Sequence, residues 1–259
     1  MTFVALTIAG SDPSGGAGIQ ADLKTFHQRG VYGTSVLTLL TVQNTRQVAS
    51  VRILEPEFVL AQLDAVLDDI PPSAAKTGAL GNEAIICALA ERAPEFRFPL
   101  VVDPVMVSKH GALLIGEGAR RQLAARLLPH ALLVTPNLQE AGALAGMTVE
   151  NAAGMREAAR RIREFGVRAV LVKGGHLPGE ALDILFWQGD FFEYTAPRVP
   201  TAHTHGTGCT LSAAVTAELA KGVELPQAVE TAKRYITRAI ESHPALGGGF
   251  GPVNHHAEI

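Results

Sequence analysis

The feature that most constrains the fold is a regular alternation, along the whole chain, between short apolar runs and longer amphipathic stretches. Several of the short runs are apolar at every position, which is typical of parallel strands covered by helices on both faces. We expect strands over residues 3–9, 35–42, 74–77, 100–102, 131–134 and 167–172. The alternation predicts a three-layer α/β/α protein with a mostly parallel central sheet.

Between the expected strands, apolar residues recur at the three- to four-residue spacing of amphipathic helices, and Asn151 is a suitable N-cap for one of them. We expect helices over residues 59–70, 155–165, 210–221 and 226–243. Residues 181–187 and 191–195 are predicted to form a hairpin appended to the sheet. Because no linker or repeat divides the chain, we expect a single domain over residues 1–259.

Composition limits the classes of partner that the chain could bind. The 259 residues include 22 basic and 25 acidic side chains, a net charge of −3, so no broad basic face for nucleic acid is required. The apolar run at residues 1–9 has no basic leader and is too short for a signal peptide or a membrane span. Cys87 and Cys209 form neither a disulfide framework nor a metal-type spacing. We therefore expect a cytoplasmic protein without nucleic-acid or membrane partners.

In such a sheet, ligands bind beyond the carboxyl ends of the strands. A glycine-rich segment beginning at Gly10 follows the first expected strand. Gly10 and Gly15 have the spacing that begins a P-loop, but Gly16 and Ala17 stand where lysine and serine or threonine are required. The segment either lets the backbone approach a flat ligand or forms only a tight turn. Asp22 lies one turn into the following helix.

Gln43 follows the second expected strand. A glutamine amide offers an acceptor and two donors in one plane, which match an aminopyrimidine edge, where an exocyclic amine lies beside a ring nitrogen. Pairing of this kind discriminates by about 1–3 kcal/mol. The alternative is that Gln43 only ties down its own loop.

Charged side chains follow three further strands. Asp103 comes directly after one strand, and Glu140 lies in the first turn of the helix after the next. Together they could hold Mg²⁺ beside a triphosphate, whereas each alone could be an N-cap or a surface residue. Lys173 ends another buried strand, where it could neutralise phosphate charge or extend along the sheet edge to solvent.

The strongest local signal is the segment 203–214, in which Gly206, Thr207 and Gly208 lead at once into a small-residue helix. The free N–H groups and the dipole of a helix start favour an anion such as a transferring phosphoryl group. Cys209 lies in the same positive field. We expect its pKa to fall below the usual value of about 8.5, so that a thiolate could accept a proton from an alcohol. The alternative is a small packing residue.

Taken together, these segments resemble the hydroxymethylpyrimidine/phosphomethylpyrimidine kinases of the ribokinase-like superfamily. The resemblance keeps its order along nearly the whole chain and covers residues 9–22, 43–45, 76–78, 103–106, 135–137, 172–176 and 205–210. It implies a homodimeric enzyme that uses ATP and Mg²⁺ to phosphorylate 4-amino-5-hydroxymethyl-2-methylpyrimidine. The monophosphate is then phosphorylated to the diphosphate used for thiamine biosynthesis.

The resemblance also implies roles for individual residues. Those near the pyrimidine are Gln43, Gly10, Asp22 and Val105. Those near ATP are Lys173, Thr135 and Asn137, with Asp103 and Glu140 for the metal. The catalytic set is Gly206, Thr207, Gly208 and Cys209, with Cys209 where sugar kinases of the superfamily carry aspartate.

One departure bears on selectivity. Ala79 stands where this family is expected to carry a methionine that packs on the pyrimidine, so the site has extra space. A pyridoxal kinase is therefore the main alternative. A sugar kinase lacks support because residues 206–209 contain no aspartate. A cysteine hydrolase or transferase would need His203 or His205 as a base for Cys209. A binding module without catalysis would retain the ligands but not consume ATP.

Overall fold

The strands of the computed structural model form one sheet. The structure describes residues 2–107, 111, 115–175, 177 and 179–259. Within these residues the strands are β1 (Val4–Ser11), β2 (Tyr32–Gln43), β3 (Val48–Ile53), β4 (Ala74–Thr77), β5 (Leu100–Val102), β6 (Leu133–Val134), β7 (Ala169–Lys173), β8 (Asp183–Trp187) and β9 (Asp190–Tyr194). Their order in the sheet is β3-β2-β1-β4-β5-β6-β7-β8-β9.

The centre of the sheet is parallel and its edges are antiparallel. Strands β2, β1, β4, β5, β6 and β7 pair in parallel. β3 adds antiparallel to β2, and the hairpin of β8 and β9 adds antiparallel to β7. The mostly parallel sheet and the hairpin are thus confirmed. β3 was not predicted: it is a short edge strand whose residues are almost all exposed, although Val51 and Ile53 alternate with polar residues.

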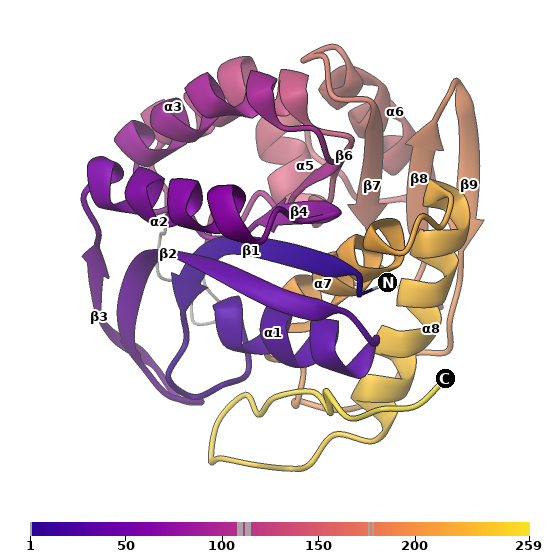
Figure 1. The fold of residues 1–259 in the computed structure, drawn as a ribbon. Coiled ribbons are helices and arrows are strands. Elements are labelled where there is room, and N and C mark those ends of the chain that lie inside the picture. Colours follow the sequence, from indigo (N-terminus) through magenta and orange to yellow (C-terminus); the bar gives the residue numbers. More distant parts are fainter. Residues whose placement is uncertain (1, 108–110, 112–114, 176, 178) are drawn as a thin grey trace.

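Helices cover both faces of the sheet (Figure 1). They are α1 (Gly18–Gln28), α2 (Pro56–Asp69), α3 (Glu83–Arg92), α4 (Glu117–Gln122), α5 (Leu138–Ala145), α6 (Ala152–Arg163), α7 (Thr207–Ala220) and α8 (Leu225–Glu241). Short turns of 3₁₀ helix lie at Ala93–Glu95 and Leu128–His130, with a π turn at Leu123–Leu127. One apolar core joins α2, α3, α5 and α6 to the sheet, and the cores on the other face involve α1, α7 and α8. The predicted three layers are confirmed.

Helix α7 is the most deeply placed of the long helices. Residues Ala213, Ala214 and Ala217 are fully buried, and α7 packs against α1, α8 and the underside of the sheet. Small side chains allow this close approach on several sides at once. The helix is therefore held rigidly, and its N-terminus has a fixed position at the carboxyl ends of the central strands.

The last residues of the chain form an extended strap after α8, drawn in yellow in Figure 1. Phe250 N–H donates to the carbonyl of Thr45 at 2.8 Å. The next residue but one, Pro252, bridges to His205, and the hydroxyl of Tyr235 donates to the carbonyl of His255 at 2.7 Å. The strap therefore joins the loop after β2 to the segment before α7.

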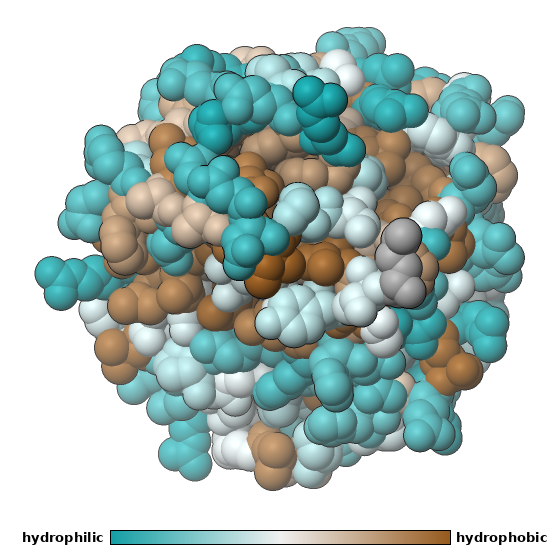
Figure 2. Space-filling model, in the orientation of Figure 1, coloured by the Kyte–Doolittle hydropathy of each residue, from teal (hydrophilic) through white to brown (hydrophobic). Residues whose placement is uncertain are grey.

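The surface facing the viewer in Figure 2 is mainly hydrophilic, with apolar side chains gathered over α2 and β3. On the edge hairpin of β2 and β3, the exposed large apolar residues include Leu40, Val42, Val51 and Ile53. Among the described residues, the longest and most apolar helices fall short of what is needed to cross a membrane.

Candidate active site

A cavity of about 890 Å³ opens at the carboxyl ends of the parallel strands, beside the start of α7. This is the place that the rule for open α/β sheets indicates, and the volume is within the usual range for small-molecule sites. The predicted site residues that line it are Gly10, Gln43, Asp103, Val105, Asn137, Glu140, Lys173, Gly206, Thr207, Gly208 and Cys209. Asp22 and Thr135, also predicted for the site, are not in this lining.

The start of α7 forms one wall of the cavity. Gly206 has φ of +79°, and a side chain there would meet the carbonyl oxygen of Gly16 at 1.7 Å, so only glycine fits. The turn lets α7 begin at Thr207, whose hydroxyl donates to the carbonyl of Thr204 at 2.5 Å. The first turn contains no acidic residue. Its N–H groups, which lack partners within the helix, therefore present positive charge to the cavity.

Lys173 and Asp103 lie directly beside this helix start. Lys173 Nζ donates to Asp103 Oδ1 at 3.1 Å, and a side chain added at Gly208 would come within 3.1 Å of the same Nζ. Burial alone would lower the pKa of Lys173, but Asp103 and Glu140 outweigh it and raise that pKa. The lysine is therefore a fixed ammonium group next to the N-terminus of α7.

Glu140 takes part in an N-cap and also lines the cavity, so it combines the two alternatives that the sequence left open. It forms a capping box with Asn137: Asn137 N–H donates to Glu140 Oε2 at 2.8 Å, and Glu140 N–H donates to Asn137 Oδ1 at 3.0 Å. Burial raises the pKa of Glu140 to about 7; Lys173 opposes this rise and Asp103 adds to it. The cap fixes the carboxylate at the cavity, where it lacks enough positive charge to ionise easily.

Thr135 supports Asp103 from below. It is fully buried, and its hydroxyl donates to Asp103 Oδ1 at 3.2 Å. Ser212, on α7, donates to the other carboxylate oxygen at 3.4 Å. The structure thus makes Thr135 an orienting partner of Asp103 and not a lining residue, because the strand alternation turns its side chain into the protein.

Asp22 is also buried away from the cavity. Its side chain is fully buried, accepts from Lys76 Nζ at 2.8 Å and from the hydroxyl of Thr7 at 2.6 Å. Lys76 does line the cavity, although sequence reasoning gave it no role. The available signal was a lysine within the short strand β4, between Ala75 and Thr77. Asp22 therefore borders the cavity only through Lys76, and its predicted place near the pyrimidine stays a prediction.

The expected activation of Cys209 is wrong for this structure. Burial raises the pKa of the thiol to about 12; Lys76 acts to lower it, whereas Asp22 and Asp103 raise it further. The helix start supplies a positive field, but it is weaker than burial and the two carboxylates that the fold brings near. At neutral pH the group at this position is a thiol.

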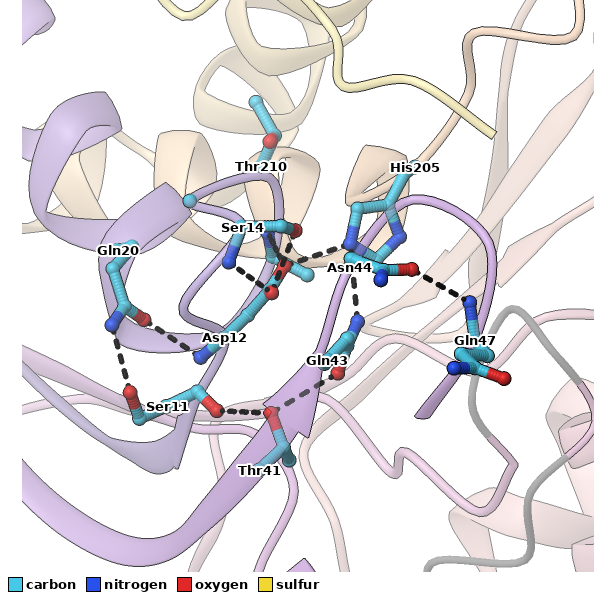
Figure 3. Close-up of polar contacts among 12 residues, drawn as sticks. Ser11, Asp12, Ser14, Gln20, Thr41, Gln43, Asn44, Gln47, His205 and Thr210 are labelled. Carbon is cyan, nitrogen blue, oxygen red and sulfur yellow. Dashed lines mark hydrogen bonds and ion pairs between the residues drawn. The ribbon is translucent and has the colours of Figure 1, made fainter. Parts of the chain in front are cut away.

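A second cluster of polar side chains, which the sequence did not reveal, lies around Gln43 (Figure 3). His205 Nε2 is 2.8 Å from Asp12 Oδ2 and 3.3 Å from the amide nitrogen of Gln43. Burial would raise the pKa of Asp12, but hydrogen bonds from His205 and Ser14 hold it below its usual value. Asp12 and His205 are 193 residues apart in the chain, so no local pattern could pair them.

A third group of lining residues, also missed, lies on the side of the hairpin of β8 and β9. Lys233, on α8, donates to Asp183 Oδ2 at 2.7 Å, and Asp183 accepts from the N–H of Gly174 at 3.0 Å. Both charged residues line the cavity, with Arg198 and Ile236. Within the described residues, no group of three or more His, Cys, Asp and Glu side chains is arranged to hold a metal ion. His176, part of one motif, lies outside the described residues.

Comparison with known proteins is consistent with this geometry. Residues 12–254 match the family model described as phosphomethylpyrimidine kinase. The chain is 52% identical over 252 residues to the thiamine biosynthesis bifunctional protein ThiED of Geobacter sulfurreducens, covering 96% of this chain and 51% of that protein. It is 48% identical to the hydroxymethylpyrimidine/phosphomethylpyrimidine kinase of Streptomyces coelicolor, covering 96% and 93%. The chain thus spans about half of the bifunctional protein and nearly all of the shorter one.

Two solved structures extend the likeness to three dimensions. The pyridoxal kinase of Bacillus subtilis in complex with ADP has a TM-score of 0.92 and 39% identity, covering 99% of this chain and 98% of that one. The phosphomethylpyrimidine kinase of Clostridium difficile has a TM-score of 0.82 and 44% identity, covering 92% and 100%. With the fold, the cavity and the match over residues 12–254 in agreement, the chain belongs to the phosphomethylpyrimidine kinase family and has its ribokinase-like fold.

Proposed function

We propose that this chain transfers the γ-phosphoryl group of ATP to the hydroxymethyl group of 4-amino-5-hydroxymethyl-2-methylpyrimidine, and then to the resulting monophosphate. The observation that carries the proposal is that Gln43 and the start of α7 line the same cavity. One supplies hydrogen-bonding groups that match an aminopyrimidine edge, and the other supplies N–H groups for an anion. The names of the relatives agree with this substrate class.

The phosphoryl group is stabilised mainly by position and charge. The N–H groups at the start of α7 and the ammonium group of Lys173 lie side by side at the cavity. Both are held before the substrate arrives, Lys173 by Asp103 and α7 by its buried small residues. Preorganised donors of this kind lower the barrier because they need not move as charge develops.

We propose Mg²⁺ as the cation bound with ATP, held through Asp103 and Glu140. Two carboxylates supply the oxygen ligands that Mg²⁺ prefers, and it needs only one or two of them beside phosphate and water. Burial, with a contribution from Asp103, raises the pKa of Glu140, and a bound cation would favour its ionised form. When bound, Mg²⁺ supplies neutralisation of the phosphate charge.

Cys209 is proposed as part of the anion-binding helix start. A thiol whose pKa is raised to about 12 is a poor proton acceptor at neutral pH, so we do not assign it the role of a thiolate base. Its small side chain lies at the cavity in the first turn of α7, where the substrate hydroxyl and the phosphoryl group would meet.

The test is a phosphoryl-transfer assay with MgATP and three acceptors: the aminopyrimidine alcohol, its monophosphate and pyridoxal. We expect ADP and the matching phosphate ester from both pyrimidines. Pyridoxal is included because Ala79 lines the cavity and leaves room for another ring. The absence of product from the aminopyrimidine, with folded protein and turnover of pyridoxal, would contradict the proposal.

We also propose that residues 1–259 act as one kinase domain, in the cytoplasm, as a homodimer. The support for the homodimer is the exposed apolar surface of the edge hairpin, which includes Val42 at 63% exposure. Light scattering after size exclusion measures the mass. We expect Val42→Lys to shift a dimer towards monomer, and a wild-type protein that is monomeric at micromolar concentration would refute this proposal.

A further inference from the structure

The amide of Gln43 has a polar neighbour at each of its two ends (Figure 3). Its nitrogen lies 3.3 Å from His205 Nε2, and its oxygen lies 3.3 Å from the hydroxyl of Thr41. A glutamine amide is nearly symmetric in shape, so a half-turn of its terminal group exchanges oxygen and nitrogen. The protons of His205 and Thr41 therefore decide which end of the amide faces which neighbour.

The carboxylate of Asp12 determines the state of His205 Nε2. Besides its 2.8 Å contact with that nitrogen, Asp12 accepts the N–H of Ala17 at 2.9 Å and two donors of Ser14 at 2.9 and 2.7 Å. A carboxylate with this many donors is ionised and can only accept. Nε2 must therefore carry a proton and donate it to Asp12, whether His205 is neutral or charged.

A protonated Nε2 cannot accept a hydrogen bond from the amine of Gln43. Its N–H can also donate, beside Asp12, to a carbonyl oxygen of Gln43 that takes the place of the amide nitrogen, 3.3 Å from Nε2. The His205 side therefore favours the amide turned by half a revolution, with its oxygen towards the imidazole.

Thr41 leads to the same orientation from the other side. Its hydroxyl oxygen lies 2.9 Å from the carbonyl oxygen of Ser11, which can only accept, so the single hydroxyl proton can be donated there. Because the contact with Gln43 is longer, at 3.3 Å, the proton goes to Ser11 and the hydroxyl offers Gln43 a lone pair. A lone pair at this end requires the amine of Gln43.

We propose that the Gln43 amide is locked with its carbonyl towards His205 and its amine towards Thr41, and that this lock sets the selectivity of the enzyme for 4-aminopyrimidines over 4-oxopyrimidines. The inference rests on the proposed function, in which Gln43 faces the pyrimidine. Asp12, His205 and Thr41 are then positioning residues, because they act on the substrate through Gln43.

The selectivity follows from the order of donor and acceptor. A 4-aminopyrimidine presents an amine donor beside a ring-nitrogen acceptor, and the 3H form of its 4-oxo analogue presents the reverse order. A glutamine that turns freely can pair with either ring. A locked glutamine keeps one lone pair and one N–H in fixed places at the cavity, so it pairs with only one of them.

The experiment compares kcat/KM for 4-amino-5-hydroxymethyl-2-methylpyrimidine with that for the 4-oxo analogue. We expect the wild-type enzyme to prefer the amino compound by about tenfold or more, the scale of one well-paired edge. Thr41→Val and His205→Leu should reduce this ratio several-fold, because each frees one end of the amide. His205→Gln, which can still donate an N–H, should retain most of it.

Thr34→Val is the matched control. It is the same substitution on the same strand, and the hydroxyl of Thr34 donates to the carbonyl of Ala5, away from the cavity lining. It should leave the ratio unchanged. Thermal unfolding of each variant shows whether it is folded.

The outcomes separate the two proposals. If the wild-type enzyme does not phosphorylate the aminopyrimidine, the proposed function fails. A second outcome is that the enzyme phosphorylates the aminopyrimidine while folded Thr41→Val and His205→Leu variants lower kcat/KM for the amino and oxo compounds by the same factor. In that case the proposed lock on Gln43 is refuted. Nuclear Overhauser effects from the Gln43 side-chain amide protons give an independent readout on the wild-type protein. They should reach the Thr41 methyl group, and effects to the His205 ring protons instead would overturn the proposed orientation.

Discussion

The two ends of the cavity are built from different interactions. At the recognition end, defined by Asp12, Thr41, Gln43 and His205, the polar side chains contact one another or the backbone within 3.3 Å. At the phosphate end, defined by Asp103, Glu140, Lys173 and Cys209, the pKa values of Glu140 and Cys209 are raised to about 7 and about 12.

This difference indicates how each end is completed. The recognition end is held in place by hydrogen bonds within the protein and suits a flat, neutral ring that needs fixed partners. The phosphate end has buried charges that a phosphate and a cation would balance, so its groups change state when ligands bind. Variants at the two ends should therefore fail in different ways.

The largest expected effect lies between the two ends, at the buried pair of Lys76 and Asp22. Lys76→Met leaves Asp22 as a buried charge without its counter-charge, with the hydroxyl of Thr7 still donating to it. We expect the free energy of unfolding in urea to fall by about 3–5 kcal/mol. The double variant with Asp22→Leu should recover part of this loss. A single variant as stable as the wild type would contradict the expected cost of leaving Asp22 without Lys76.

At the phosphate end, Lys173→Ala removes the ammonium group that neighbours the start of α7. We expect kcat/KM for ATP to fall by about 100- to 1000-fold in both phosphorylation steps. Lys173→Arg keeps the charge and serves as the control. A loss confined to the KM of the pyrimidine would place Lys173 at the wrong end of the cavity.

At the recognition end, Gln43→Leu should act on the pyrimidine alone. Loss of the paired edge is expected to cost about 1–3 kcal/mol of transition-state stabilisation, which lowers kcat/KM for the pyrimidine. The KM for ATP should not change. Steady-state kinetics with each substrate varied in turn measures the split. An equal loss of kcat/KM for ATP and for the pyrimidine would show that Gln43 is not specific to the recognition end.

Cys209→Ala tests whether the thiol accepts a proton during catalysis or only forms part of the helix start. With a pKa raised to about 12, the thiol should react slowly with iodoacetamide at pH 7 and faster as the pH rises. We expect the substitution to lower both steps by a similar factor, below about tenfold. A much larger loss in the first step, where an alcohol must lose its proton, would restore the base role.

The smallest expected effect concerns the pH dependence of stability. The folded pKa of Glu140, about 7, is above its usual value of 4.5, so the folded state binds more protons between these values. The contribution of Glu140 to stability therefore decreases as the pH rises from about 4.5 to 7. Glu140→Gln should be more stable than the wild type at pH 8, by on the order of 1 kcal/mol, and nearly equal at pH 4. Denaturation at both pH values measures it.

Much of the fold was predictable because the central strands are apolar on both faces. The limits of β4 and β5 agree with the prediction at both ends. β6 is shorter than the expected 131–134, because the chain leaves a 3₁₀ turn at His130 just before it. β3 was missed although Val51 and Ile53 alternate with polar residues, because so short a run on an exposed edge is easily taken for a loop.

Within the site, sequence reasoning succeeded where one strand end determines the answer. Asp103 and Lys173 line the cavity because each follows a buried parallel strand. It failed where partners come from distant segments, as for Asp12 with His205 and for Lys233 with Asp183. For Cys209, the local argument from the helix start ignored the carboxylates that other strands bring near.

The C-terminal strap has a consequence for the order in which the enzyme is made. Phe250 and Pro252 hold the loop of Thr45 and the segment of His205, the two supports of the recognition end. These residues leave the ribosome after every other part of the cavity wall has been synthesised. A nascent chain can thus build its sheet before the supports of the recognition end are in place, and a released chain truncated after residue 245 should be folded yet inactive.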